Sequence, residues 1–132
     1  MLLKAPDQRT VRIAELNDRL RKGTLPNGRL VVTANAANEI AMKIAETYKI
    51  EATSPAYQPI YRTQLAKALA GATIDAKNNP YFERDFGTLE VLGVKLFFKI
   101  DYYDCEMKSH SADAADHQIT VRVCTVMLPS DY

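Results

Sequence analysis

The fold is decided by one stretch of the chain, FGTLEVLGVKLFFKIDYY, which occupies residues 86–103. Apolar and polar side chains alternate on both sides of Leu92-Gly93, which is the pattern of two strands that each bury one face. A turn at Leu92-Gly93 would match apolar with apolar residues and one glutamate with a lysine: Val91 with Val94, Glu90 with Lys95, Leu89 with Leu96, and Gly87 with Phe98. The stretch therefore predicts an antiparallel hairpin in which Gly87 leaves room for the Phe98 ring. Because Leu92 is unfavourable in a type I′ turn, we expect a type II turn or a loop wider by one residue.

The sheet extends from this hairpin into a third strand, predicted for residues 118–128, beside strands over residues 86–92 and 94–103. Alternation assigns two rows of side chains to the core face, which are Val94, Leu96, Phe98, Ile100 and Tyr102 from one strand and Ile119, Val121, Val123, Thr125 and Met127 from the last. The opposite face mixes Lys95, Lys99, Asp101 and Arg122 with Phe97, Tyr103, Val126 and Leu128. For that face two alternatives stay open: the N-terminal helix packs on it, or it is an interaction surface.

Helical patterns fill most of the chain before the hairpin. A helix is predicted over residues 8–22, with Asp7 as its N-cap and Gly23 ending it, and a short strand over residues 30–33 follows. Further helices are expected from an Asn35 cap to about Lys49 and over residues 60–70. The fold class is therefore α+β: an antiparallel sheet of three to four strands, a β-meander at the C-terminal end, packed against two to three helices.

Length and composition indicate one domain spanning residues 1–132, which is long enough to bury a core without disulfides or metals. Cys105 and Cys124 are too few for a disulfide framework, which favours a reducing cytoplasm. No apolar run approaches the roughly 20 residues of a membrane span, and the N-terminus does not resemble a signal peptide. We expect a cytoplasmic protein that makes no membrane contact.

Charge is nearly balanced overall, at +1, but it is distributed unevenly. Residues 1–33 hold seven basic and three acidic side chains, a local net charge of +4, whereas residues 100–132 hold two basic and six acidic ones, a net charge of −4. A dedicated nucleic-acid-binding domain is usually basic throughout, so this distribution argues against direct nucleic-acid binding. The alternatives are two solvated faces, or an acidic edge that binds a basic partner.

The candidate binding residues lie on that acidic edge, where tyrosines precede a loop rich in carboxylates. They are Asp101, Tyr103, Asp104, Glu106, Asp113 and Asp116. Tyrosine is enriched at the centres of protein interfaces because it offers apolar area with a polar tip. The expected partner is a larger protein with a basic surface; the sequence leaves the oligomeric state open.

Catalytic patterns are weak. Asp101, Asp104 and Asp116, with Asp113, His110 and His117 nearby, could supply ligands to a divalent metal, and a metal-dependent hydrolase or nuclease is therefore the alternative function. Their spacing matches no EF-hand, so we expect a solvated acidic loop without a metal or cofactor. Cys124 lies in the middle of a strand, where an inert buried thiol is expected.

Five short motifs, one near the start of the chain and four in its last third or just before it, carry a family resemblance. They are Leu16-Asn17-Asp18-Arg19, Asn79-Pro80-Tyr81, Asp85-Phe86-Gly87, Lys99-Ile100-Asp101-Tyr102-Tyr103-Asp104 and Thr120-Val121-Arg122-Val123. With them the chain resembles a small bacterial domain family of unknown function, met in chromosomes and on mobile elements, over residues 13–33 and 78–132. Arg84 stands where the family pattern has a histidine, and Leu92-Gly93 where it has Asp-Gly. Residues 34–77 are expected to be a helical, insertion-like segment that diverges from the family.

The resemblance implies a fold more than an activity, because the family has no established function. Its occurrence on mobile elements suggests a non-enzymatic protein-binding module that inhibits a host defence complex, such as a CRISPR effector, by stoichiometric binding. The sequence thus predicts a binding protein rather than an enzyme.

Overall fold

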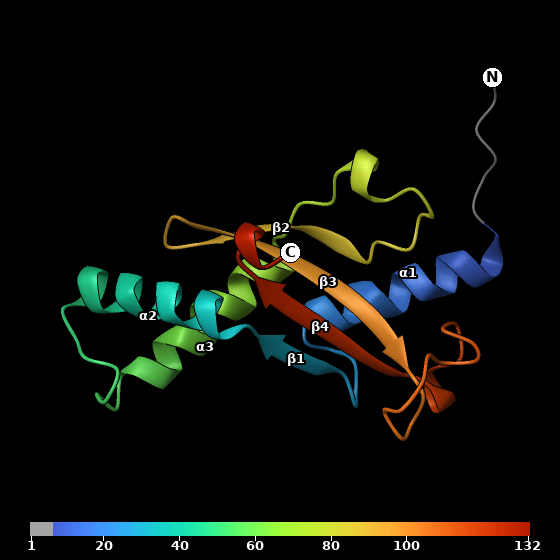
Figure 1. Ribbon diagram of the computed structural model, residues 1–132, viewed down its shortest axis with the longest axis horizontal. Coiled ribbons are helices and arrows are strands. Elements are labelled where there is room, and N and C mark those ends of the chain that lie inside the picture. The colour runs from blue at the N-terminus through green and yellow to red at the C-terminus, as the bar shows by residue number, and fades with distance from the viewer. Residues whose placement is uncertain (1–6) are drawn as a thin grey trace.

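The structure is a computed structural model that describes residues 7–132. Three helices precede most of the sheet: α1 (Gln8–Arg21), α2 (Ala34–Tyr48) and α3 (Tyr57–Ala70). The sheet contains β1 (Arg29–Val32), β2 (Phe86–Val91), β3 (Val94–Tyr103) and β4 (Val121–Met127). Short 3-10 turns η1 (Ala76–Asn78), η2 (His117–Ile119) and η3 (Pro129–Asp131) complete the described elements. The predicted α+β fold, with its strands gathered at the C-terminal end, is confirmed (Figure 1).

The four strands form one mixed sheet in the order β1-β4-β3-β2. The three C-terminal strands pair antiparallel in sequence order, as a β-meander. β1 instead pairs parallel with β4, with Arg29 opposite Val123 and Val32 opposite Val126. The sheet is therefore antiparallel only from β2 to β4. In the sequence α2 and α3 connect β1 to the meander, and this long connection allows β1 to join the far edge of the sheet, beside β4.

The hairpin has the predicted register, with Val91 opposite Val94, Leu89 opposite Leu96 and Gly87 opposite Phe98. Its turn differs from the expectation, since Leu92 and Gly93 both have positive φ, 49° and 86°, as a type I′ turn requires. Type I′ geometry matches the twist of the two strands, and Leu92 is half-buried against the core. That packing offsets the strain of positive φ at a leucine.

Gly87 lies where the backbone comes closest to its neighbours. A Cβ atom there would stand 2.5 Å from the carbonyl oxygen of Thr73 and 2.6 Å from the Phe98 ring. The prediction that Gly87 leaves room for the Phe98 ring is confirmed, and the close approach of the Thr73 backbone is a second reason why a glycine is needed here. Thr73 and Thr88 exchange backbone hydrogen bonds of 2.8 and 2.9 Å, so the chain after α3 covers the middle of the outer edge of β2.

The core face of β3 is confirmed, because Val94, Leu96, Phe98, Ile100 and Tyr102 are all buried. The core face predicted for β4 is wrong by one residue. Phe98 pairs with Val126, Ile100 with Cys124 and Tyr102 with Arg122, so these three β4 residues share the helix-covered face. The predicted row of Val121, Val123, Thr125 and Met127 faces the other way.

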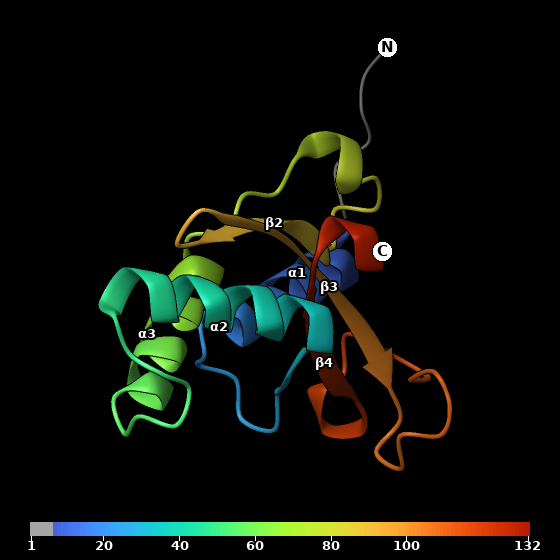
Figure 2. The same ribbon diagram turned by 60° about the vertical axis from the view of Figure 1, so that its left-hand side comes forward.

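All three helices pack on that one face. α2 and α3 lie side by side beneath the β2–β3 hairpin (Figure 2), and they contribute Ile40, Ile44, Leu65 and Leu69 to the core. α1 passes behind β3 and β4 (Figure 1) and buries Ile13 and Leu16. The predicted Asp7 cap of α1 is confirmed, but Thr33, not Asn35, caps α2. α3 begins three residues earlier than predicted, with Pro59 in its first turn, where proline is tolerated.

The opposite face of β3 and β4 has no α-helix over it in the described structure, only the short η3 at one end, and Figure 1 looks onto it. It presents Lys99, Asp101 and Tyr103 beside Val121 and Thr125, all half-buried. At one end the rings of Phe86, Phe97 and Tyr132 contact one another at centroid distances of 5.2–6.0 Å. Of the two alternatives for this face, packing of the N-terminal helix is therefore wrong.

Candidate functional site

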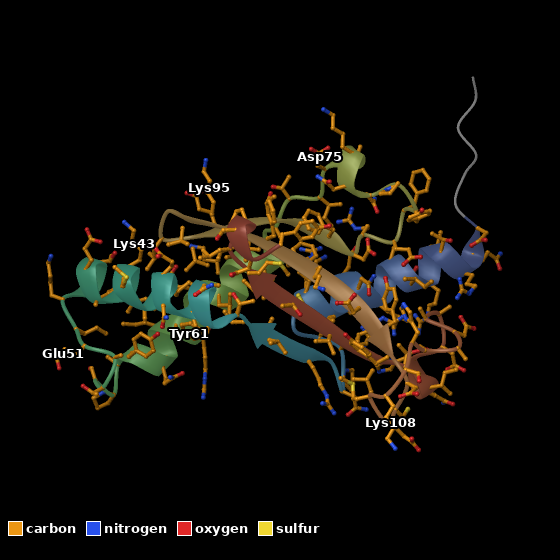
Figure 3. All side chains as sticks on the ribbon, viewed as in Figure 1. Lys43, Glu51, Tyr61, Asp75, Lys95 and Lys108 are labelled. Atoms are coloured by element: carbon orange, nitrogen blue, oxygen red, sulfur yellow. The ribbon has the colours of Figure 1, made fainter. Side chains whose placement is uncertain are left out.

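The predicted binding residues occupy two adjoining places. Asp101 and Tyr103 lie on the helix-free face of β3, while Asp104, Glu106, Asp113 and Asp116 lie on the segment 104–120, which we call the acidic loop. This loop projects beyond the ends of β3 and β4 (Figure 1), and Figure 3 shows Lys108 pointing away from the molecule there. The structure thus brings the acidic loop and the uncovered sheet face together at one end of the sheet.

Three of the loop carboxylates hold the loop itself. Asp104 accepts a hydrogen bond from the Lys108 amide, at 3.0 Å, and Asp116 accepts one from the Gln118 amide, also at 3.0 Å. Asp113 accepts the Ala115 amide at 3.0 Å and the Arg9 Nε of α1 at 2.9 Å. The hydrogen bond from Ala115, with that from Arg9, lowers the pKa of Asp113 below its usual value. These side chains therefore define the conformation of the loop in addition to its charge.

Glu106 and Asp101 differ from those three. Glu106 is 76% exposed, and its carboxylate lies 3.7 Å from the ammonium of Lys108. Asp101 is 38% exposed and lies 3.3 Å from the ammonium of Lys99 on the same strand. Exposed pairs of this kind contribute little to stability. Among the predicted residues, Glu106 can therefore be changed with the least disturbance to the loop.

The acidic side chains do not converge on a common point. Within residues 7–132 no group of three or more His, Cys, Asp or Glu side chains is arranged to hold a metal ion. Asp101 is directed to the sheet face, whereas Asp104 and Asp116 are engaged with separate turns of the loop. The set proposed for a metal-dependent activity is not assembled in this structure.

A second polar cluster, which the sequence reasoning missed, lies between α1 and the sheet. Asn17 is fully buried and donates hydrogen bonds to the Tyr102 hydroxyl, at 2.7 Å, and to the Glu83 carbonyl, at 2.9 Å. The Tyr102 hydroxyl in turn donates to the Glu83 carboxylate at 2.8 Å. Burial and Glu83 raise the Tyr102 pKa, so the phenol remains a donor. The cluster fixes α1, β3 and the segment before β2 relative to one another.

Arg122 belongs to the same cluster and is 0% exposed. Its Nε donates to the side-chain oxygen of Asn17 at 3.3 Å, and its guanidinium carbon lies 5.4 Å from the centroid of the Tyr102 ring. The two terminal nitrogens have no hydrogen-bond partner within the described residues. Burial lowers the pKa of Arg122, since desolvation disfavours its charged form. Arg122 was predicted on the opposite face of the sheet. That prediction is wrong because the two faces of β4 were assigned one residue out of step.

An ion-pair group adjoins this cluster at the C-terminal half of α1. Asp18 accepts hydrogen bonds from Arg84 at 2.8 Å and from Arg21 at 3.0 Å. Burial raises the pKa of Asp18, but these two hydrogen bonds outweigh it and leave the value below normal. Arg84 has a φ of 57° and so is in the strained left-handed region. Its bond to Asp18 helps to hold that conformation.

The signal for this cluster was present but ambiguous. Asn17 and Arg122 interrupt otherwise apolar rows, and both lie in motifs that the resemblance had singled out without a role. A polar residue within an apolar row usually faces solvent, so the pattern alone favoured exposure.

The two cysteines lie apart from these clusters. Cys124 is buried, as expected, and burial raises the pKa of its thiol to about 12, so the nucleophilic thiolate is strongly disfavoured. Cys105 is exposed on the acidic loop, with its sulfur 3.6 Å from the Gln118 carbonyl. Neither arrangement resembles an activated nucleophile.

No helix within residues 7–132 has the length and apolar character needed to cross a bilayer.

Comparison with curated proteins and with solved structures gave no match. A family model described as "Protein of unknown function (DUF3768)" matches residues 47–131, from the end of α2 to η3, and so takes in α3 and the whole meander. The resemblance to a family of unknown function is thereby confirmed, and because the match spans more than half of the sequence, the chain belongs to the DUF3768 family.

Proposed function

We propose that this chain is a non-enzymatic protein-binding module of the cytoplasm that docks on a basic surface of a larger protein. The observation that supports it is the position of the acidic loop beside a sheet face that no described α-helix covers. Tyr103 and Asp101 lie on that face, next to the loop. An aromatic anchor flanked by carboxylates suits a partner site that normally accepts nucleobases and phosphates.

Charge on the loop gives the proposal its physical basis. Asp104, Glu106, Asp113 and Asp116 oppose Lys108, so the acidic loop, residues 104–120, has a net charge of −3 with both histidines neutral. A concentrated charge of one sign accelerates association with an oppositely charged surface and makes binding weaken with salt.

The partner class we put forward is a large nucleic-acid-binding assembly of a defence system, such as a CRISPR effector, which the chain would inhibit by occupying its basic groove. This step rests on the mobile-element context of the resemblance. It requires that the chain itself bind no DNA or RNA, in keeping with its near-neutral charge.

The first prediction concerns Glu106. Charge reversal by Glu106→Lys should reduce capture of the partner from bacterial lysate about tenfold at low salt, because it changes the loop charge by two units. Quantitative mass spectrometry of pull-downs would measure the change. The matched control is Glu46→Lys on α2, which is also exposed, at 68%, and paired with a lysine three residues away.

Capture should fall for the loop variant alone and should decline for the wild type as salt is raised. Equal capture by both variants would contradict docking through the loop. Asp113 is unsuitable for this test, because its reversal would also break the bond to Arg9 and the turn at Ala115.

The second prediction separates this proposal from a metal-dependent hydrolase or nuclease. Millimolar magnesium, manganese or zinc should leave the melting temperature of the protein unchanged, because an ion stabilises a fold only where it binds. Differential scanning fluorimetry would test this. A metal-dependent increase that disappears in Asp104→Asn, a change that conserves the shape of the side chain, would favour the enzymatic alternative.

A further inference from the structure

The two edges of the sheet differ in what covers them. At β2 the chain after α3 pairs with the middle of the strand through Thr73 and Thr88. At β1 no described strand lies on the outer side. The Thr33 amide donates to the Val126 carbonyl, at 3.0 Å, so alternation along the strand points the N–H and C=O groups of Leu30 and Val32 away from β4. β1 therefore offers an open set of backbone donors and acceptors.

An apolar groove runs beside this open edge. Leu30, Val32, Tyr61, Leu65 and Ala66 line a cavity of 430 Å³ between β1 and α3, together with Arg62 (Figure 3 labels Tyr61 on α3). A neighbouring cavity of 240 Å³ continues along Leu30 and Ala66 toward the end of α1. Leu30 is 49% exposed although it faces the helices. The side chains of an added strand would enter this groove on one face.

The rim of the groove is basic. Arg62 and Lys22 belong to the linings of the two cavities, and Arg29 lies on the other face of β1, where it pairs with Val123. All three are exposed. Neither lining contains an aspartate or glutamate. Within residues 7–132 none of the three has a carboxylate within ion-pair distance, in contrast to Arg9, Arg21 and Arg84. Uncompensated positive charge thus lies on both sides of the open β1 edge, from Arg62 and Lys22 at the groove and from Arg29 on the other face.

We propose that β1 receives an extended, acidic segment of a partner protein as a fifth strand. Its backbone would pair with Leu30 and Val32, and alternate apolar side chains would fill the groove against Tyr61, Leu65 and Ala66. Its carboxylates would lie on the other face of the added strand, beside Arg29. Strand addition of this kind takes affinity from the main chain and specificity from alternate side chains. A second copy of this chain is disfavoured, because a two-fold pairing of β1 would bring Arg29, Arg62 and Lys22 of both copies together.

The test uses a fluorescein-labelled peptide of ten residues that alternates valine and glutamate, with binding followed by fluorescence anisotropy. Two control peptides separate the contributions. One has lysine in place of every glutamate, and the other holds the same residues as one block of valines and one block of glutamates. Binding of the alternating acidic peptide alone is the expected result.

Variants locate the site. Arg29→Glu should weaken binding of the alternating peptide about tenfold, whereas Lys95→Glu, also a charge reversal at an exposed strand position but on β3, should leave it within about twofold. Val32→Pro removes an outward N–H while sparing those that bond to β4, as proline does on edge strands, and should weaken binding about tenfold. Far-ultraviolet circular dichroism would show that each variant is folded.

Several outcomes would overturn the proposal. They are equal binding of the lysine peptide or the block peptide, equal effects of the two charge reversals, no effect of Val32→Pro in a folded protein, or absence of binding to every peptide. Sedimentation that shows a dimer lost on Val32→Pro would assign the edge to a second copy instead. Because the test involves no residue of the acidic loop, its result is distinguishable from failure of the proposed function.

Discussion

Phe98→Ala should lower the free energy of unfolding by about 3–5 kcal/mol, the range for deletion of a fully buried aromatic ring. Phe98 is 0% exposed at the centre of β3, with Gly87 and Val126 as its cross-strand neighbours. Both neighbours are held by backbone pairing, so the site can collapse little around the missing ring. Urea unfolding followed by circular dichroism would measure the loss.

The adjacent Phe97 provides the matched control, since it lies on the same strand with its ring on the helix-free face. Phe97→Ala should cost less than Phe98→Ala, because the ring is only half-buried, against Phe86 and Tyr132. If Phe98→Ala prevents folding, Phe98→Leu should still cost about 1–2 kcal/mol. A larger loss from the Phe97 variant than from the Phe98 variant would contradict the assigned faces.

Asn17→Ala should destabilise the protein by about 2–4 kcal/mol, although it removes only a small side chain. The amide of Asn17 satisfies the Tyr102 hydroxyl and the Glu83 carbonyl, and its oxygen accepts the hydrogen bond from Arg122. Its loss would leave a buried guanidinium without the acceptor it has in the described structure. Denaturant unfolding of the single variant would measure the cost.

A double-mutant cycle would show how much of that cost comes from Arg122. Arg122→Met alone should change stability by less than about 1 kcal/mol, because an apolar chain of similar length avoids the desolvation of a buried charge. In the Arg122→Met background, Asn17→Ala should cost at least about 1 kcal/mol less than in the wild type. Additive losses would mean that Asn17 acts through Tyr102 and Glu83 alone.

The parts of the fold that could be predicted are those with one consistent local pattern. The hairpin register followed from matched pairs on both sides of Leu92-Gly93, and the start of α1 followed from Asp7 as a cap. In β4 the pattern fails because apolar residues occupy both faces, with Val123 and Met127 on one and Cys124 and Val126 on the other. A slip of one residue then exchanges the faces at little apparent cost in hydrophobicity. The parallel pairing of β1 depends on a crossover that no local signal encodes.

In the candidate site, too, features with a local sequence pattern could be predicted and features that depend on the folded chain could not. Exposure of the acidic loop was predictable from composition, but the sequence did not distinguish carboxylates that define loop turns from those free to contact a partner. Aspartates that hydrogen-bond the backbone two residues ahead are common in turns, and Asp113 and Asp116 both do so. The Asn17–Arg122 contact joins residues 105 positions apart, so it exists only once α1 has packed on the sheet.

The closure of β2 by Thr73 has a consequence for aggregation. Sheets become fibres when both edges are open, because each added strand exposes a new edge to the next molecule. In this fold an incoming strand at β2 would first have to displace the Thr73–Thr88 pairing, which occupies the middle of that edge. Edge-to-edge stacking of folded copies therefore lacks one of its two required surfaces, and β1 can remain open without making the native protein polymerise.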